Sequence, residues 1–311
     1  MSVCRKEVET EYLSPVPDAA CVERIPATGN LIARALAFII RAWREFQMSD
    51  FKKTLKAAAV AAVCGVGLCA LARKLKLSRA VSDIAQSVEA VPFPGTRIYA
   101  FLAAKQLHPL YAAIADQLAN ANSFQRILDL GTGLGYLPIE LARRRPELCI
   151  IGVDQAPDLI RIANANARAF RAKHDVEFRT GDPTNLPYPG RYFDLVVSVN
   201  VLHHWRDPLA IFEEVNHILV PGGQFWIYDY RKDVPKDIWD KMECRLSRLD
   251  RLALQFGPEA SSRAAYSEDK LVELAQRANF VDISVEDQTL PAFGCDIPAF
   301  VRMILHKPSQ Q

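Results

Sequence analysis

A glycine-rich loop with an acidic residue just before it is the segment of this 311-residue chain whose residue types best suit chemistry. The run 127–135 (ILDLGTGLG) predicts a strand that leads into a loop and then into a helix. Glycines at 131 and 133 permit positive φ angles and let a ligand approach the backbone closely. Asp129, at the strand end, would repel a pyrophosphate, so we expect a ligand that carries an ammonium or sulfonium group.

A second acidic residue, Asp154, ends the next predicted strand, 25 residues after Asp129. A carboxylate at that place in a βαβ unit accepts hydrogen bonds from ribose hydroxyls. A dinucleotide fingerprint, G-x-G-x-x-G, would need its last glycine where Tyr136 stands. The pattern therefore indicates a positively charged nucleoside ligand and disfavours an NAD(P)-dependent oxidoreductase. The simpler alternatives are that Asp129 only caps its strand and that Asp154 only caps the following helix.

The elements that must position these acids alternate between strands and helices. Short apolar runs predict strands over five segments, 126–130, 148–154, 176–180, 193–199 and 224–230. Helical patterns lie between them at 134–144, 158–170 and 208–219. Such alternation predicts an α/β protein with a doubly wound parallel sheet that helices cover on both faces.

The last part of the chain predicts a different connection. After a helical region at 236–256 and a helix from Ser267 to about Asn279, we expect two strands at 281–287 and 299–306. The eleven residues between them contain two prolines and a glycine, so they cannot form a crossover helix. The two strands should therefore be antiparallel neighbours, which gives a seven-stranded, mostly parallel sheet with a reversed last strand.

Composition and charge narrow the classes of function. The chain has 38 basic and 36 acidic residues, a formal net charge of +2, which provides no bulk attraction to nucleic acid. Its seven cysteines are scattered without a C-x-x-C pair, so we expect no metal site, no disulfide framework and reduced thiols, as in the cytoplasm. The first thirty residues lack the apolar core of a signal peptide.

From residue 92 onward, the order of motifs resembles the class I S-adenosylmethionine-dependent methyltransferases. LDLGTGLG is similar to the first motif, and GVDQAPDLI to the second strand with its ribose-binding acid. GDPTNLPYPGRYFDLVVSVNVLHHWRDP resembles the adenine-side loop and fourth strand, and LVPGGQFWIYDYRK the turn into the fifth strand. The LHHW and IYDYR segments are most similar to bacterial small-molecule enzymes of the quinone-biosynthesis branch. The resemblance implies a Rossmann-like fold, S-adenosyl-L-methionine as cofactor and methylation of a small acceptor.

The resemblance also implies which residues hold the cofactor. Asp129, Gly131 and Gly133 would surround its methionine part, Asp154 its ribose and Asp182 its adenine amino group. Asn200 would lie beneath the cofactor, and the loop neighbours Thr132 and Gln155 complete the expected cofactor-binding set. The family commonly offers adenine a backbone N–H after the acid of the third strand, but here that residue is Pro183, which has none. A turn-closing role is the alternative for Asp182.

Two histidines are the candidate catalytic residues. His203 and His204 follow the fourth predicted strand, at the carboxyl edge where α/β sheets place their sites. Methyl transfer from a sulfonium is an in-line displacement that needs mainly orientation, and a general base is needed only if the acceptor must lose a proton. A histidine in such a loop is as often structural; Asp229 and Tyr230, after the fifth strand, could also reach the substrate. The rival hypothesis is a membrane-tethered cofactor-binding or assembly factor without turnover, which Pro183 favours.

Residues 1–90 form a separate, basic extension in front of the expected methyltransferase domain at 91–311. The stretch 31–79 contains ten basic and two acidic residues. Within it, 31–46 has the pattern of a basic amphipathic helix, which lies either in a membrane interface or against the neighbouring domain. Residues 57–72 are uncharged but short for a transmembrane helix, so a buried or surface-lying helix is the alternative. We expect association with the cytosolic face of a membrane and a small-molecule or lipid-like acceptor.

Overall fold

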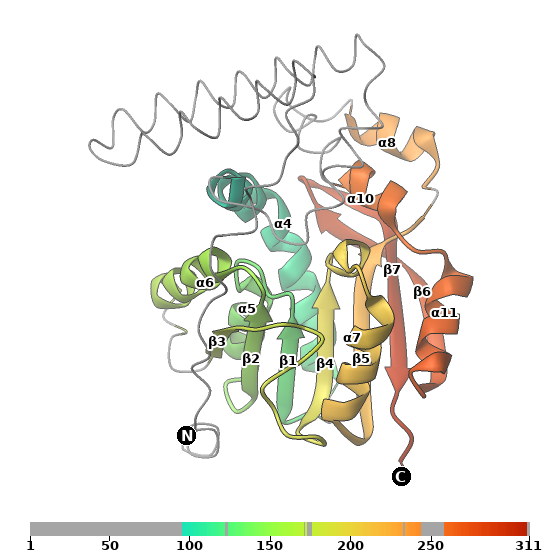
Figure 1. Cartoon of the computed structure of the whole chain (residues 1–311). Coiled ribbons are helices and arrows are strands. Elements are labelled where there is room, and N and C mark those ends of the chain that lie inside the picture. Colours follow the sequence, from blue (N-terminus) through green and yellow to red (C-terminus); the bar gives the residue numbers. More distant parts are fainter. Residues whose placement is uncertain are drawn as a thin grey trace, which may run out of the picture. The chain divides into compact units, whose positions relative to one another are not determined.

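A computed structural model describes residues 95–121, 124–170, 172, 176–232, 234–243 and 258–309 (Figure 1). The expected extension at 1–90, with its amphipathic helix at 31–46 and its apolar segment at 57–72, lies outside these residues. Among the residues that are described, no helix combines the length and the apolar character needed to cross a membrane.

Seven strands form one sheet, in the order β3-β2-β1-β4-β5-β7-β6. The strands are β1 (Arg126–Leu130), β2 (Cys149–Asp154), β3 (Val176–Thr180), β4 (Phe193–Val199), β5 (Leu219–Tyr230), β6 (Val281–Ala292) and β7 (Cys295–His306). Strands β1 to β5 pair in parallel, whereas β7 runs antiparallel to both β5 and β6. The predicted doubly wound sheet with its reversed last strand is confirmed.

Helices cover both faces of this sheet. They are α4 (Gly95–Asn120), α5 (Tyr136–Arg144), α6 (Pro157–Ala169), the short 3-10 helix η2 (Leu202–His204), α7 (Pro208–Ile218), α8 (Lys236–Glu243), α10 (Pro258–Ala264) and α11 (Glu268–Arg277). Alternate side chains of β5 contact opposite layers: Phe225 packs on Phe212 of α7, while Tyr228 donates a hydrogen bond to Gln117 of α4. Helices α4 and α7 accordingly lie on opposite faces of the sheet (Figure 1).

Local sequence explains where several helices begin. Helices α6 and α7 each have a proline in the first turn. Proline suits this position because backbone N–H groups in the first turn make no hydrogen bond within the helix. The carboxylate of Asp207 accepts a hydrogen bond from the backbone of Ala210, 3.1 Å away, and so caps α7. Gly135, with a φ of 76°, ends the glycine-rich loop, so α5 begins at Tyr136 rather than at 134 as predicted.

The structure corrects the predicted connection between the last two strands. Instead of an eleven-residue loop, β6 and β7 extend towards each other and meet in a turn made of Phe293 and Gly294. Both residues have positive φ, 54° and 74°, as a two-residue hairpin requires. Phenylalanine is not a usual residue at such a position, so the sequence carried little signal for the turn.

Helix α4 runs without a break from Gly95 to Asn120, with Pro109 inside it. One other expectation needs correction. The expectation that the thiols are reduced is wrong for Cys149, which is disulfide-bonded, whereas Cys295 is free. Disulfide pairing depends on proximity in space, which the spacing of cysteines along a chain does not reveal.

Candidate active site

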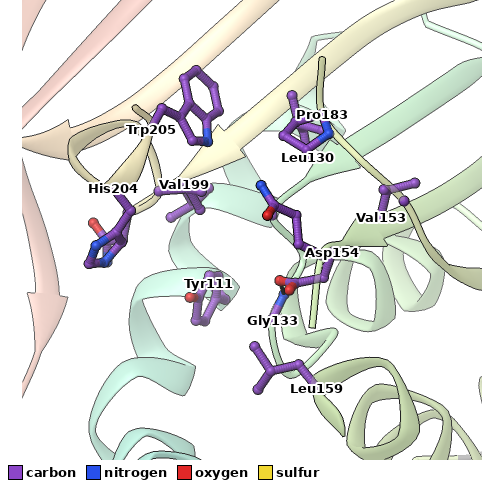
Figure 2. Close-up of a pocket in the computed structure, with 15 residues that line it drawn as sticks. Tyr111, Leu130, Gly133, Val153, Asp154, Leu159, Pro183, Val199, His204 and Trp205 are labelled. Carbon is purple, nitrogen blue, oxygen red and sulfur yellow. Dashed lines mark hydrogen bonds between the residues drawn. The ribbon is translucent and has the colours of Figure 1, made fainter. Parts of the chain in front are cut away.

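A cleft opens at the carboxyl ends of β1, β2 and β4 (Figure 2). In the sheet order, β1 lies between β2 and β4. The strands that follow β1 are thus added first on one side of it (β2, β3) and then on the other (β4, β5), and ligands of α/β proteins bind at such a switch point. About 850 Å³ of the cleft is not filled by protein atoms, a volume that includes the solvent at its open mouth.

The glycine-rich loop forms the floor of this cleft. The backbone N–H groups of Gly131 and Thr132 both donate to the carbonyl of Val153, at 2.8 and 2.9 Å, which joins the loop to β2. Gly131 has a φ of 81°, and a Cβ there would lie 2.5 Å from Val201, so no larger residue fits. Gly133 faces open space instead and lines the cleft. The loop therefore presents bare backbone to a ligand.

Asp129 lies beneath the loop and does not itself line the cleft. It is 3% exposed. Burial raises the pKa of its carboxyl to about 7; the nearby Thr132 hydroxyl opposes this shift, and the charge of Asp154 adds to it. A positively charged ligand above the loop would favour the ionised form of this carboxyl.

Asp154 lines the cleft and joins the loop to the start of α6. Its two carboxylate oxygens accept hydrogen bonds from the backbone of Gly133 and of Ala156, both at 2.9 Å. Burial raises its pKa, and these two hydrogen bonds oppose the shift. Each oxygen keeps a lone pair with which it can accept a ribose hydroxyl. Gln155 also lines the cleft.

The adenine-side prediction has less support in the geometry. Asp182 is exposed, and its Oδ1 accepts hydrogen bonds from the backbone and hydroxyl of Thr184, at 2.9 and 2.7 Å, which closes the turn. The neighbours Gly181 and Pro183 line the cleft, whereas Asp182 does not. A contact between Asp182 and adenine therefore remains a prediction.

Asn200 occupies a strained position at the end of β4. Its φ is 58°, and its backbone N–H donates to the carbonyl of Tyr228 at 2.8 Å. The side chain lines the cleft, and its buried Oδ1 has no hydrogen-bond partner among the described residues. An unsatisfied buried acceptor at a left-handed residue is typical of a ligand contact.

The two candidate histidines differ in their surroundings. His203 is buried, and its Nδ1 lies 2.7 Å from a carboxylate oxygen of the equally buried Asp229. The backbone N–H of His203 also donates to Asp229, at 3.2 Å, and the buried Nε2 finds no partner in the part of the chain that is described. His204 lines the cleft, with its ring 4.1 Å from that of His203. Burial and the neighbouring His203 lower the pKa of His204 to about 4, against the opposing charge of Asp229, so His204 is uncharged at neutral pH.

The cleft thus contains six of the ten predicted site residues, namely Gly131, Gly133, Asp154, Gln155, Asn200 and His204. Asp129, Thr132 and His203 lie behind these residues, and Asp182 lies at the surface. Sequence reasoning missed Tyr111, which reaches the cleft from α4. No motif surrounds Tyr111, and only the helical pattern of its buried neighbours placed it near the core. No group of three metal-binding side chains occurs among the described residues.

Comparison with known proteins assigns this site to a family. A family model described as "Methyltransferase domain" matches residues 121–279, half of the chain. The chain therefore belongs to the S-adenosylmethionine-dependent class I methyltransferases. The matched segment contains the loop, both cofactor-side acids and both histidines.

Two curated relatives illustrate the range of the family. The chain is 34% identical over 119 residues to a demethylmenaquinone methyltransferase from Deinococcus radiodurans, which covers 38% of this chain and 48% of the relative. It is 31% identical over 128 residues to the erythromycin 3''-O-methyltransferase of Saccharopolyspora erythraea, which covers 40% and 41% of the two chains. The chain thus spans about half the length of the curated relatives it matches.

Solved structures support the fold. A proposed O-methyltransferase from Nostoc punctiforme superimposes with a TM-score of 0.52 at 20% identity, over 69% of this chain and 60% of the other. A proposed S-adenosyl-L-methionine-dependent methyltransferase from Methanococcus maripaludis gives 0.51 at 22% identity, over 70% and 94%. At these identities the likeness concerns the fold alone.

Proposed function

We propose that this protein transfers a methyl group from S-adenosyl-L-methionine to a small, lipophilic acceptor by in-line displacement. The observation that carries the proposal is the convergence of three features at the switch point of the sheet. These features are a bare glycine loop, a buried carboxylate that has no cation beside it among the described residues, and Asp154 aimed into the cleft. Together they suit a nucleoside that carries a positive charge.

The residues of this chain would act by holding and orienting. When bound, S-adenosyl-L-methionine supplies a methyl group already activated by its positively charged sulfur. Asp129 would stabilise that positive region from beneath the loop, Asp154 would accept the ribose hydroxyls, and the Asn200 carbonyl oxygen would supply a further acceptor. These groups would hold the methyl donor in a fixed position, and in-line transfer then needs an acceptor atom about 3–3.5 Å from the methyl carbon.

A proton must leave if the acceptor is a hydroxyl, and His204 is the group in the cleft that can take it. Its low pKa makes it a weak base, but methylation of a neutral hydroxyl creates an oxonium whose proton even a weak base removes. His203 lies directly behind His204 and is oriented by Asp229. We assign His204 to proton acceptance and His203 to support of its ring.

The membrane part of the proposal rests on the basic stretch 31–79. Ten basic residues would attract anionic lipid, at about 1 kcal/mol each near the surface. We therefore propose an extension at 1–90 that brings the methyltransferase domain at 91–311 to the cytosolic face of a membrane, where a lipophilic acceptor dissolves. Flotation with anionic liposomes tests this by comparison of the full chain with a chain that starts near Val81; equal behaviour at low and physiological salt contradicts it.

The decisive experiment on activity uses methyl-labelled cofactor with fractionated lipid and small-molecule extracts. Transfer of label to an extract component supports the enzyme. Tight binding of the cofactor without transfer in any fraction supports instead a non-catalytic binding or assembly factor. Binding of a nicotinamide dinucleotide in place of S-adenosyl-L-methionine overturns both the methyltransferase and the non-catalytic factor.

A further inference from the structure

The cleft has two ends with different linings. In Figure 2, Gly133, Asp154 and Val153 lie on one side, while His204 and Trp205 lie on the other, with Tyr111 below them. The proposed function puts the cofactor at the end formed by the loop and Asp154. The acceptor then lies at the end formed by Tyr111, His204 and Trp205, which we call the aromatic end.

The described residues of the aromatic end offer no positive charge to an acceptor. Among the described residues that line the cleft, none is lysine or arginine. His204 is uncharged at neutral pH, and behind it the ring of His203 pairs with the carboxylate of Asp229. The carboxylates of Asp129 and Asp154 lie beyond it, so an anionic acceptor would lose its hydration and meet repulsion.

The aromatic side chains of this end are also held in place by their neighbours. Trp205 is buried, packs edge-on against Phe212 at 6.3 Å, and its carbonyl accepts a hydrogen bond from the Tyr266 hydroxyl at 3.3 Å. The ring of Tyr111 lies 6.2 Å from that of Tyr136, across the helix pair α4 and α5. Aromatic side chains fixed in this way offer a large contact area to a ligand and lose little conformational entropy when it binds.

We propose that the aromatic end selects an uncharged, planar, conjugated acceptor, and that Tyr111 on α4 is the residue that recognises its ring. This inference rests on the proposed function, because that function decides which end holds the cofactor. Tyr111 is a specificity-determining residue in this scheme, and it does not contribute to cofactor binding.

Three matched probes test the selection by charge and by shape. They are 2-naphthol, its anionic relative 6-hydroxy-2-naphthoate, and the saturated decahydro-2-naphthol. Each is titrated into the full-length protein saturated with S-adenosyl-L-homocysteine, and binding is measured by calorimetry or ligand-observed NMR. We expect 2-naphthol to bind at least about 10-fold more tightly than the carboxylate and about 3- to 10-fold more tightly than the saturated alcohol. Equal affinities, or binding of none of the three, overturn the inference.

Two leucine variants test the role of Tyr111. Tyr111→Leu should reduce the affinity for 2-naphthol to that of the saturated alcohol and leave the affinity for S-adenosyl-L-homocysteine unchanged. The matched control, Phe170→Leu, removes an aromatic ring that is 40% exposed outside the cleft and should change neither affinity. If Tyr111→Leu still prefers 2-naphthol to the saturated alcohol, or if this variant no longer binds S-adenosyl-L-homocysteine, the assignment is contradicted. Failure of the wild-type protein to bind S-adenosyl-L-homocysteine at all instead overturns the proposed function.

Discussion

Two carboxylates at the cleft, Asp129 and Asp229, are equally buried but have opposite surroundings. Both are 3% exposed. Asp229 is satisfied on every side, since it pairs with the ring of His203 and accepts hydrogen bonds from the backbone of His203 and Tyr230, the latter at 2.7 Å. Asp129 has the Thr132 hydroxyl and the charge of a second acid beside it, and burial raises its pKa to about 7.

The difference separates a structural acid from one that awaits a ligand. A buried charge is stable only when partners replace its lost water, and Asp229 has them within the protein. Among the described residues, no cation lies beside Asp129, so the fold is less stable with this residue ionised. A positively charged ligand would remove that penalty and gain binding energy from it. The comparison therefore predicts that the two residues respond in opposite ways to the same substitution.

Stability should show the largest effect. Asp229→Ala leaves His203 buried without its partner and should lower the free energy of unfolding by on the order of 3–5 kcal/mol. Asp129→Ala, the matched change at equal burial, removes an uncompensated carboxyl and should cost much less. Urea unfolding of both variants at pH 8, without ligand, measures the contrast. Equal losses would show that the two surroundings do not differ in energy.

Cofactor binding should show the reverse order. Asp129→Ala removes the carboxylate beneath the loop and should weaken binding of S-adenosyl-L-methionine by about 1–3 kcal/mol, the range for a lost interaction with a charged group. Calorimetry measures the change, and the control is Phe170→Leu, outside the cleft. A variant that binds as tightly as the wild type would refute the placement of the positive charge above Asp129.

Asp154 sharpens the comparison, because it should not distinguish charged from uncharged ligands. Its carboxylate is assigned to the ribose, which S-adenosyl-L-methionine and S-adenosyl-L-homocysteine share. Asp154→Ala should therefore weaken both by a similar amount, about 1–2 kcal/mol, whereas Asp129→Ala should weaken the sulfonium more than the uncharged product. Parallel titrations of both ligands measure this. A selective loss in Asp154→Ala would mean that this acid contacts another part of the ligand.

Much of the framework around these residues was predictable because its signals are local. Strands β1, β3 and β4 have the predicted bounds, since short apolar runs between turn residues determine them. The glycine loop and Asp154 were predictable for the same reason, because backbone geometry and one βαβ unit place them. The β6–β7 turn was not predictable, since Phe293 has a positive φ, which is unusual for phenylalanine.

The aromatic end of the cleft could be predicted only in part, because it is assembled from distant parts of the chain: His204 was a candidate from its place after the fourth strand, whereas Tyr111 was not. The His203–Asp229 contact joins residues 26 positions apart on neighbouring strand ends. Tyr111 comes from a helix that precedes the first strand, and its position depends on how α4 packs against α5. Composition and spacing identify such residues as candidates, but only the packed fold decides which of them face the cleft.

The pH dependence of binding should show the smallest effect and offers the most direct test of the comparison. In the free protein the pKa of Asp129 is about 7, raised from its ordinary 3.8. The native state therefore holds a proton that the unfolded chain has already lost. As pH rises from about 4 to 7, this group should reduce the stability of the free protein. A bound sulfonium favours the ionised carboxyl and lowers its pKa.

Binding of S-adenosyl-L-methionine should therefore release a proton below about pH 7. The affinity should fall as pH decreases through this range, by at most about 10-fold per pH unit, and should level off above about pH 8. Calorimetry in buffers of different ionisation enthalpy counts the protons released. In Asp129→Asn the pH dependence should disappear, while Asp154 and its hydrogen bonds remain. Over the same pH range, the stability of the free protein should fall with rising pH while the affinity for S-adenosyl-L-methionine rises. Opposite slopes of the free energy of unfolding and of the affinity against pH would therefore identify one group as the cause of both. Parallel slopes would assign the proton to a different residue.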